Sequence, residues 1–254
     1  MSDRTVLRNE KIVIFGGGSG IGRAIAVRFI EAGAKVIITG RTEEKLIETA
    51  KTINSENLFY KVFDITDIGH HINFFEECEK CIGEVSAFVN AAAIASSVYT
   101  GRGYDPWDIT EDEWNYLSDT NYKAAFFIMR NEINYMLQRG IRGNILNIAS
   151  NGAYKGIFGS YGSAKLSITK WTRTLGQRYG HKGIIINGIA PGATFTPMIA
   201  RYAKKIDQHF PLHAIERLIR ADEIAELAFY LMSNYGEIIC GHTVVADGGD
   251  NDAY

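Results

Sequence analysis

A serine, a tyrosine and a lysine could together move a proton to or from an alcohol oxygen. Tyr161 and Lys165 are four residues apart, and Ser150 lies eleven residues before the tyrosine. Residues four apart share one face of a helix, so the ammonium can stand beside the phenol. A free tyrosine ionises near pH ~10, and a neighbouring cation lowers that pKa. We expect Tyr161 to be a general acid or base, with Ser150 donating a hydrogen bond to the substrate oxygen. Because many helices carry such a pair by chance, the surrounding elements decide the interpretation.

A glycine-rich turn near the N-terminus strengthens this interpretation. Residues 11–15 form an apolar, β-branched run that predicts a buried parallel strand, and residues 23–32 have helical periodicity. Between them, residues 16–22 include five glycines. A strand, a glycine turn and a helix in this order are typical of dinucleotide binding, because the backbone can approach a pyrophosphate and the helix N-terminus attracts anions. The expected cofactor contacts are Gly16, Gly18, Ser19, Gly20, Ile21 and Gly22.

Length, composition and charge exclude several classes of protein. The 254 residues are 46% hydrophobic and have a net charge of −2, without a basic stripe, so nucleic acid is not an expected partner. No apolar run has the length of a membrane span, and the first ten residues lack a signal-peptide core. We expect a single domain over residues 1–254, in the cytoplasm and not in a membrane. Cys78 and Cys81 lack a second ligand pair, so no metal site is predicted.

Strand-like and helix-like runs alternate along the chain. The expected strands are 11–15, 35–39, 58–63, 87–90, 144–148, 184–189 and 243–246. The expected helices are 23–32, 43–53, 68–81, 111–138, 161–179 and 222–232, the fourth beginning at a capping box from Thr110 to Glu113. This alternation predicts a Rossmann-type α/β fold, a doubly wound parallel sheet of about seven strands with helices on both faces. Ligands bind such sheets beyond the carboxyl ends of the strands. We also expect a small substrate lobe around residues 194–218.

Several motifs occur in one fixed order. They are Gly16, Gly20 and Gly22, then Asp64 with Ile65, then residues 90–93, Asn121, the Ser150–Tyr161–Lys165 set, Pro191 and Gly192 with Thr196, and residues 246–249. In this order the chain resembles the short-chain dehydrogenase/reductase family over nearly its whole length. The resemblance implies hydride transfer between a nicotinamide and a carbonyl or secondary alcohol. It also implies a homo-oligomer, a tetramer or a dimer, in which the strand at 243–246 could lie at an interface.

The resemblance assigns roles to individual residues. Tyr161 would donate the proton in reduction and accept it in oxidation, while Lys165 would lower the tyrosine pKa and bind the nicotinamide ribose. Asn121 would hold a water molecule that links Lys165 to solvent; the alternative is that its side chain caps local backbone. Further cofactor contacts would come from Asp64, Ile65, Asn90, Ala91, Ala92, Pro191, Gly192, Thr194 and Thr196.

Two positions depart from the family pattern. Phe15 stands where a threonine is usual, and residues 91–93 are alanines where the family's Asn-Asn-Ala-Gly element continues. In relatives the threonine ties the glycine turn to that element. Both ends of the tie are changed here, so we expect an apolar contact to replace it.

The residues after the second strand favour NADP(H), with NAD(H) possible. An NAD-selective site usually has an acid there, which binds the ribose 2′-hydroxyl. Here Arg41 offers a guanidinium to a 2′-phosphate, and Thr42 offers a hydroxyl. The alternative is that Arg41 is a surface charge before a helix.

The substrate is the least determined feature. The stretch 96–107 is longer than is usual in the family, and Tyr104, Trp107, Tyr154, Phe158 and residues 199–215 are expected to frame a pocket or to serve as packing or subunit contacts. We expect a small carbonyl or alcohol substrate, which could be a sugar, a polyol, a steroid or an acyl compound. The alternatives are an NAD-dependent sugar, polyol or hydroxysteroid dehydrogenase, a catalytically idle nucleotide-binding member, and an epimerase or dehydratase on the same sheet.

Overall fold

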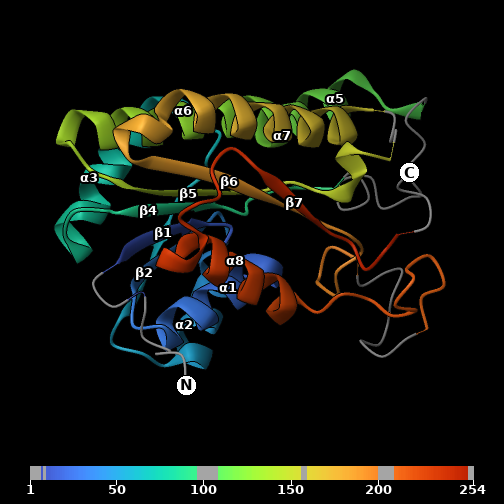
Figure 1. Ribbon diagram of the computed structural model, residues 1–254, viewed down its shortest axis with the longest axis horizontal. Coiled ribbons are helices and arrows are strands. Elements are labelled where there is room, and N and C mark those ends of the chain that lie inside the picture. The colour runs from blue at the N-terminus through green and yellow to red at the C-terminus, as the bar shows by residue number, and fades with distance from the viewer. Residues whose placement is uncertain (1–6, 8–9, 96–107, 156–158, 200–208, 251–254) are drawn as a thin grey trace.

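Seven parallel strands form the centre of the protein. The computed structural model describes residue 7 and residues 10–95, 108–155, 159–199 and 209–250 (Figure 1). Within them the sheet order is β3-β2-β1-β4-β5-β6-β7, and every neighbouring pair is parallel. The strands are β1 (Lys11–Phe15), β2 (Lys35–Gly40), β3 (Leu58–Val62), β4 (Ala87–Asn90), β5 (Gly143–Ile148), β6 (Ile184–Pro191) and β7 (Thr243–Ala246). The order reverses between β1 and β4. The predicted doubly wound sheet is confirmed, with strand bounds correct to within two residues.

Helices cover both faces of the sheet, as predicted. On one face lie α1 (Gly20–Glu31), α2 (Glu43–Ile53) and α8 (Ala221–Met232); on the other lie α3 (His71–Ile82), α5 (Glu111–Ser118), α6 (Ala125–Arg139) and α7 (Ser160–Tyr179) (Figure 1). Short 3-10 turns occur at Ile68–His70, Asn151–Ala153, Gly180–Lys182 and Asn234–Gly236. No described helix combines the length and apolar character that a bilayer crossing requires.

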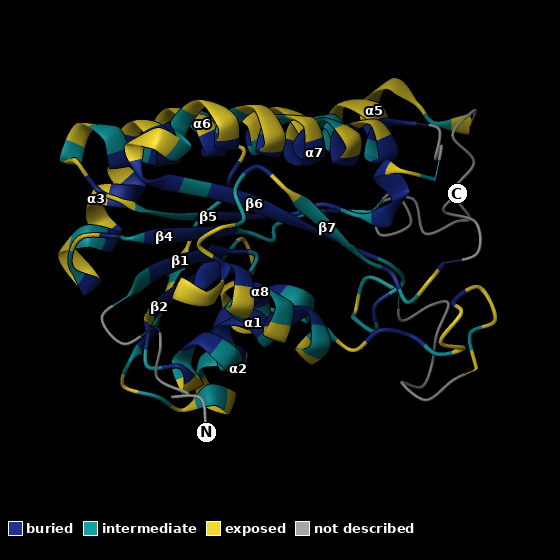
Figure 2. Ribbon diagram, in the orientation of Figure 1, coloured by how far each residue is buried: buried dark blue, intermediate teal, exposed yellow. Residues whose placement is uncertain are grey.

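Alternation along the central strand separates two apolar cores. In β1, Ile12 and Ile14 pack with α1 and α8, while Val13 and Phe15 pack with α3 and α6. Successive strand residues point to opposite faces, so a strand that is covered on both sides is apolar throughout. The buried sides of the helices accordingly face the sheet, and their exposed sides face outward (Figure 2).

Phe15 belongs to an aromatic cluster behind the glycine turn. Its ring centroid lies 6.0 Å from that of Phe74 and 6.3 Å from that of Phe75. Ala92 packs against the same core, and the Ala91 amide donates a 2.9 Å hydrogen bond to the Phe15 carbonyl. The expected apolar replacement for the family's threonine tie is therefore present, together with a backbone hydrogen bond.

The long helix predicted at 111–138 is interrupted. Its capping box is confirmed, because the Glu113 amide donates to the Thr110 hydroxyl (3.2 Å) and the Thr110 amide donates to the Glu113 carboxylate (2.8 Å). Between α5 and α6, however, the chain makes a π-helical turn at Asp119–Ala124. A π turn inserts an extra residue without ending the helix, so the amphipathic spacing on either side conceals it. Asn121 lies in this turn.

Candidate active site

A cavity of ≈510 Å³ lies at the carboxyl ends of the strands, around the point where the strand order reverses. Of the residues predicted to be catalytic or to bind the cofactor, all except Asn90 and Asn121 line this cavity. The parallel sheet explains the convergence, because it brings the carboxyl ends of β1, β2, β4, β5 and β6 to one edge.

The glycine turn forms one wall of the cavity. Gly16 and Gly20 have φ of +82° and +54°, which favour glycine. A Cβ on Gly22 would lie 2.3 Å from the Gly16 carbonyl oxygen, and one on Gly16 would lie 2.7 Å from the Ala92 backbone. The turn leads into α1, whose first turn carries no acid. The positive end of the helix dipole is therefore not opposed locally, and this wall fits a pyrophosphate.

Ser150, Tyr161 and Lys165 come together on the opposite wall. Ser150 follows the end of β5, and the other two lie on successive turns of α7. The Ser150 hydroxyl lies close enough to the Tyr161 phenol to favour its ionised form. The Lys165 Nζ donates a 2.8 Å hydrogen bond to the Ile148 carbonyl oxygen and lies 5.7 Å from the Tyr161 ring centroid. These three side chains can hold one oxygen atom and exchange a proton with it.

The pKa of Tyr161 is shifted in the direction opposite to the one predicted. Burial raises the pKa of Tyr161, and the Ser150 hydroxyl only partly opposes that shift. The prediction that Lys165 lowers the tyrosine pKa is therefore wrong for this arrangement. Removal of water from the phenol disfavours its charged form, and this effect is the largest. Burial also lowers the pKa of Lys165, to about 8.

Asn121 lies beside the cavity rather than on its wall. Its Nδ2 donates to the Ile94 carbonyl (2.8 Å), and its Oδ1 accepts from the Ile94 amide (3.0 Å). These contacts correspond to the alternative interpretation, in which the side chain secures local backbone. Ile94 does line the cavity, so Asn121 supports its wall. The water-binding role stays a prediction.

Cationic side chains gather where the adenosine end of a dinucleotide would lie. Arg41 donates a 3.3 Å hydrogen bond to the Tyr116 hydroxyl, and its Nη1 is 3.9 Å from an Asp64 carboxylate oxygen. Lys45, in the first turn of α2, lines the same cavity and was not predicted. Its place in the first turn of the helix that follows β2 is the signal that could have identified it. Thr42 begins the helix without making a side-chain capping bond.

The opposite end of the cavity carries a buried ion pair that was not predicted. Lys155 is paired with Asp250, and their side chains are 14% and 5% exposed. The Asn151 Nδ2 donates a 2.8 Å hydrogen bond to the same carboxylate. Two of these residues closely follow Ser150, so their position after β5 could have indicated them. No sequence pattern near Asp250 indicated a role in the cavity, because only the fold brings it beside Lys155.

The residues expected to frame the substrate pocket are only partly placed there. Within the segment 199–215, Ile199, Phe210 and Leu212 line the cavity. Tyr154 is 42% exposed and is not part of its wall. The other aromatic residues expected there, Tyr104, Trp107 and Phe158, lie outside the described residues.

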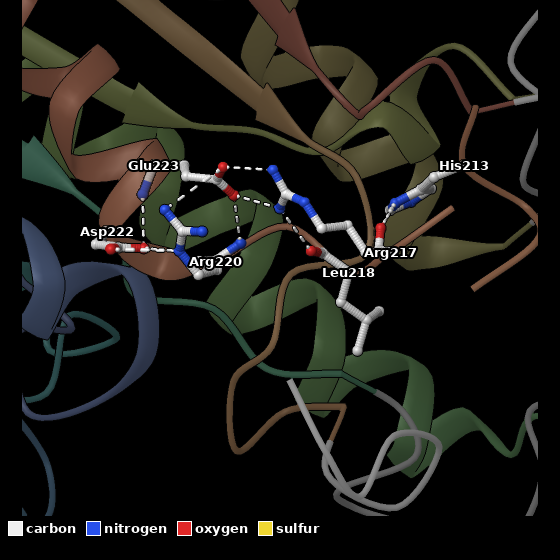
Figure 3. A network of polar contacts seen from close by, with 6 residues as sticks. All are labelled: His213, Arg217, Leu218, Arg220, Asp222 and Glu223. Atoms are coloured by element: carbon white, nitrogen blue, oxygen red, sulfur yellow. Dashed lines mark hydrogen bonds and ion pairs between the residues drawn. The ribbon is translucent and has the colours of Figure 1, made fainter. Parts of the chain in front are cut away.

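A polar network anchors this segment to α8 (Figure 3). Arg217 binds both carboxylate oxygens of Glu223, at 2.8 and 2.7 Å, and this contact lowers the pKa of Glu223 to about 2. The Arg217 carbonyl in turn hydrogen-bonds to His213 Nδ1 at 2.8 Å. The network holds the chain just after Phe210 and Leu212, which line the cavity.

Comparison with known proteins agrees with this geometry. A family model described as enoyl-(acyl carrier protein) reductase matches residues 16–251. The chain belongs to the short-chain dehydrogenase/reductase family. It is 30% identical to levodione reductase of Leifsonia aquatica, over 100% of this chain and 98% of that protein. It is 31% identical to the A-factor type gamma-butyrolactone 1'-reductase (1S-forming) of Streptomyces virginiae, over 98% of each.

Solved structures of the family have the same fold. The chain is similar to the 3-ketoacyl-(acyl-carrier-protein) reductase of Brucella melitensis complexed with NADH, with a TM-score of 0.85 and 25% identity over 96% of this chain and 98% of that one. As a short-chain dehydrogenase/reductase, the protein is a nicotinamide-dependent oxidoreductase that acts on alcohol or carbonyl groups.

Proposed function

We propose that the protein is an NADP(H)-dependent oxidoreductase that interconverts a carbonyl and a secondary alcohol, with Tyr161 as the acid–base. The observation that carries this proposal is that Ser150, Tyr161 and Lys165, the last two on successive turns of α7, line one cavity with the glycine turn. The cofactor supplies or accepts the hydride, and the protein supplies orientation and electrostatics.

Ser150, Tyr161 and Lys165 each have a separate role in the reaction at the substrate oxygen. In reduction, the Tyr161 hydroxyl donates its proton to that oxygen as negative charge develops. The Ser150 hydroxyl donates a hydrogen bond to the same oxygen. Lys165, held by Ile148, supplies a positive charge near the phenolate that remains. Because burial raises the tyrosine pKa, Tyr161 is protonated at neutral pH, as donation of a proton to a carbonyl oxygen requires.

The preference for NADP(H) rests on the cations at the adenosine end. Arg41 and Lys45 line that end, and the Arg41 side chain is 43% exposed, so its guanidinium is open to a phosphate. Tyr116 and Asp64 both contact the guanidinium. Arginine binds phosphate through paired hydrogen bonds. NAD(H) remains the alternative cofactor.

We infer that the substrate is a neutral compound with a second polar oxygen at some distance from the reacting carbon. Met198, Ile199, Phe210 and Leu212 give the substrate end apolar walls, to which the Lys155–Asp250 pair adds polar atoms. Because the ion pair is internally compensated, it favours a hydrogen-bonding group over a charged one.

We also propose a homo-oligomer. The outer faces of α5, α6 and α7 expose Trp114, Phe126 and Leu166, each by more than 40%. Tyr122 and Trp171 extend the patch, with ring centroids 5.0 Å apart. Exposed apolar side chains on these helices, with Phe126, Tyr122 and Trp171 in ring contact, fit a contact with a second copy. Analytical ultracentrifugation of the wild type and of Phe126→Glu tests this interface. If both proteins sediment with the same mass, the patch is not the subunit contact. The cytoplasmic location stays a prediction.

An absorbance screen in the reduced-nicotinamide band tests the function. Purified protein is assayed with NADPH or NADH against cyclic diketones, hydroxyketones, steroids, sugars and polyols. We expect turnover with NADPH and a neutral ketone that carries a second oxygen. Cofactor binding without hydride transfer across the panel would contradict the proposal and favour a nucleotide-binding protein without activity.

A further inference from the structure

Glu132 is a fully buried carboxyl group in the middle of α6. Its Oε2 accepts one hydrogen bond, 3.0 Å long, from Asn90 Nδ2. Its Oε1 has no hydrogen-bond partner among the described residues. Burial raises the pKa of Glu132 to about 8, so the group is largely protonated at neutral pH. A buried carboxyl with one partner costs stability, and an apolar residue of similar size would avoid that cost.

The contact with Glu132 determines how the Asn90 amide is oriented. Asn90 Nδ2 donates to Glu132 Oε2 and also, at 2.9 Å, to Asn147 Oδ1. Asn147 is itself oriented, because its Nδ2 donates to the Thr172 hydroxyl at 3.0 Å. Reversing the Asn90 amide would place its oxygen against the Asn147 Oδ1 acceptor, and the Asn90–Asn147 hydrogen bond would be lost. Asn90 Oδ1 is therefore held on the other side, buried and without a partner among the described residues.

A second cavity connects this amide to the catalytic lysine. It measures ≈20 Å³, and Asn90, Asn147 and Lys165 supply its polar lining. A volume of roughly 10–15 Å³ suffices for one water molecule when two or more polar partners are present. Lys165 uses one N–H on the Ile148 carbonyl and has others to donate. One water between Lys165 Nζ and Asn90 Oδ1 would satisfy both groups.

We propose that Glu132 is a positioning residue for Lys165: it orients the Asn90 amide so that Oδ1 holds one water, which fixes a second N–H of the lysine. The carboxyl group touches neither substrate nor cofactor and acts through Asn90. This inference rests on the proposed function, in which Lys165 supports Tyr161. It gives a reason for a carboxyl group in the apolar interior, where its own burial is unfavourable.

Two substitutions separate this role from simple packing. Glu132→Gln keeps an acceptor for Asn90, whereas Glu132→Met keeps the volume and removes the acceptor. We expect Glu132→Met to lower kcat about tenfold, since small displacements of catalytic groups have effects of this order or larger. Its melting temperature should change little, because the loss of a buried carboxyl and the loss of the acceptor for Asn90 have opposite effects on stability. Glu132→Gln should retain most of kcat. The control is Met136→Leu, one turn along the same helix and also buried, which should match wild type.

Two kinetic results would overturn the proposal: wild-type kcat in Glu132→Met, or equal losses in the Gln and Met variants. If the Met variant does not fold, a high-resolution crystal structure of the wild type decides. We expect an ordered water within hydrogen-bond distance of both Lys165 Nζ and Asn90 Oδ1, and its absence there would refute the inference. This structural result is independent of turnover, so a wild type without activity would count against the proposed function alone.

Discussion

The ammonium group of Lys165 donates a 2.8 Å hydrogen bond to the carbonyl oxygen of Ile148. This bond ties α7 to the end of β5, two residues before Ser150. The lysine is 3% exposed, and burial lowers its pKa to about 8. Near neutral pH it therefore still carries its proton, one helical turn from Tyr161. A proton donor and a nearby cation therefore lie together on the cavity wall formed by α7 and the end of β5.

Tyr161→Phe should reduce turnover by about a thousandfold while cofactor binding is largely kept. The substitution removes the only proposed proton donor, and general acid–base catalysis commonly contributes 10²–10⁴-fold. The phenyl ring still fills the wall. Steady-state kcat and the cofactor Kd from fluorescence quenching measure the two effects. Tyr154→Phe is the matched control, because Tyr154 is exposed and does not line the cavity. Substantial turnover in Tyr161→Phe would refute the assignment.

Arg41→Ala should lower kcat/KM with NADPH by about 10- to 100-fold and change the value with NADH little. The range corresponds to the loss of a charge-assisted hydrogen bond of roughly 1.5–3 kcal/mol. The comparison of the two cofactors in one variant removes general effects on folding. Lys35→Ala serves as a control, since this exposed cation lies at the opposite end of β2. Equal losses with both cofactors would remove the argument for NADP(H).

Glu132 should make stability depend on pH in a definite direction. Its folded pKa, about 8, lies above the ordinary value of ~4.3. Between these pH values the folded state keeps a proton that the unfolded state has lost. The wild type should therefore lose stability relative to Glu132→Gln as pH rises from ~4.3 to about 8. Urea unfolding of both proteins across this range measures the difference. Parallel stability curves would show that the carboxyl group does not titrate as described.

Phe15→Thr, which introduces the residue usual in the family, should destabilise this protein. The change removes a ring from the aromatic cluster with Phe74, Phe75 and Phe88 and buries a hydroxyl there. Truncation of a buried aromatic ring costs about 3–5 kcal/mol, and an unpaired hydroxyl adds to the loss. Phe15→Leu should cost less, because it stays apolar. Denaturant unfolding measures both. A Thr variant as stable as the Leu variant would mean that the hydroxyl finds a partner near Ala91 and Ala92.

Much of the fold was determined by the sequence alone, because its signals are local. Continuous apolar, β-branched runs predicted seven strands, period-3.6 apolar patterns predicted their covering helices, and the glycine spacing located the turn before α1. Tyr161 and Lys165 were placed on one helix by their spacing of four. The π turn at Asp119–Ala124 escaped this reasoning, because one extra helical residue leaves the pattern on either side intact.

Only the tertiary structure decided the features that depend on burial or on contacts between distant residues. The pKa of Tyr161 is raised because the depth of burial outweighs the opposing effect of Ser150. Asp250 meets Lys155, and Glu132 meets Asn90, across separations that no local pattern encodes. Spacing tells which side chains share a face, but the loss of water around a charged group is set by everything that packs over it.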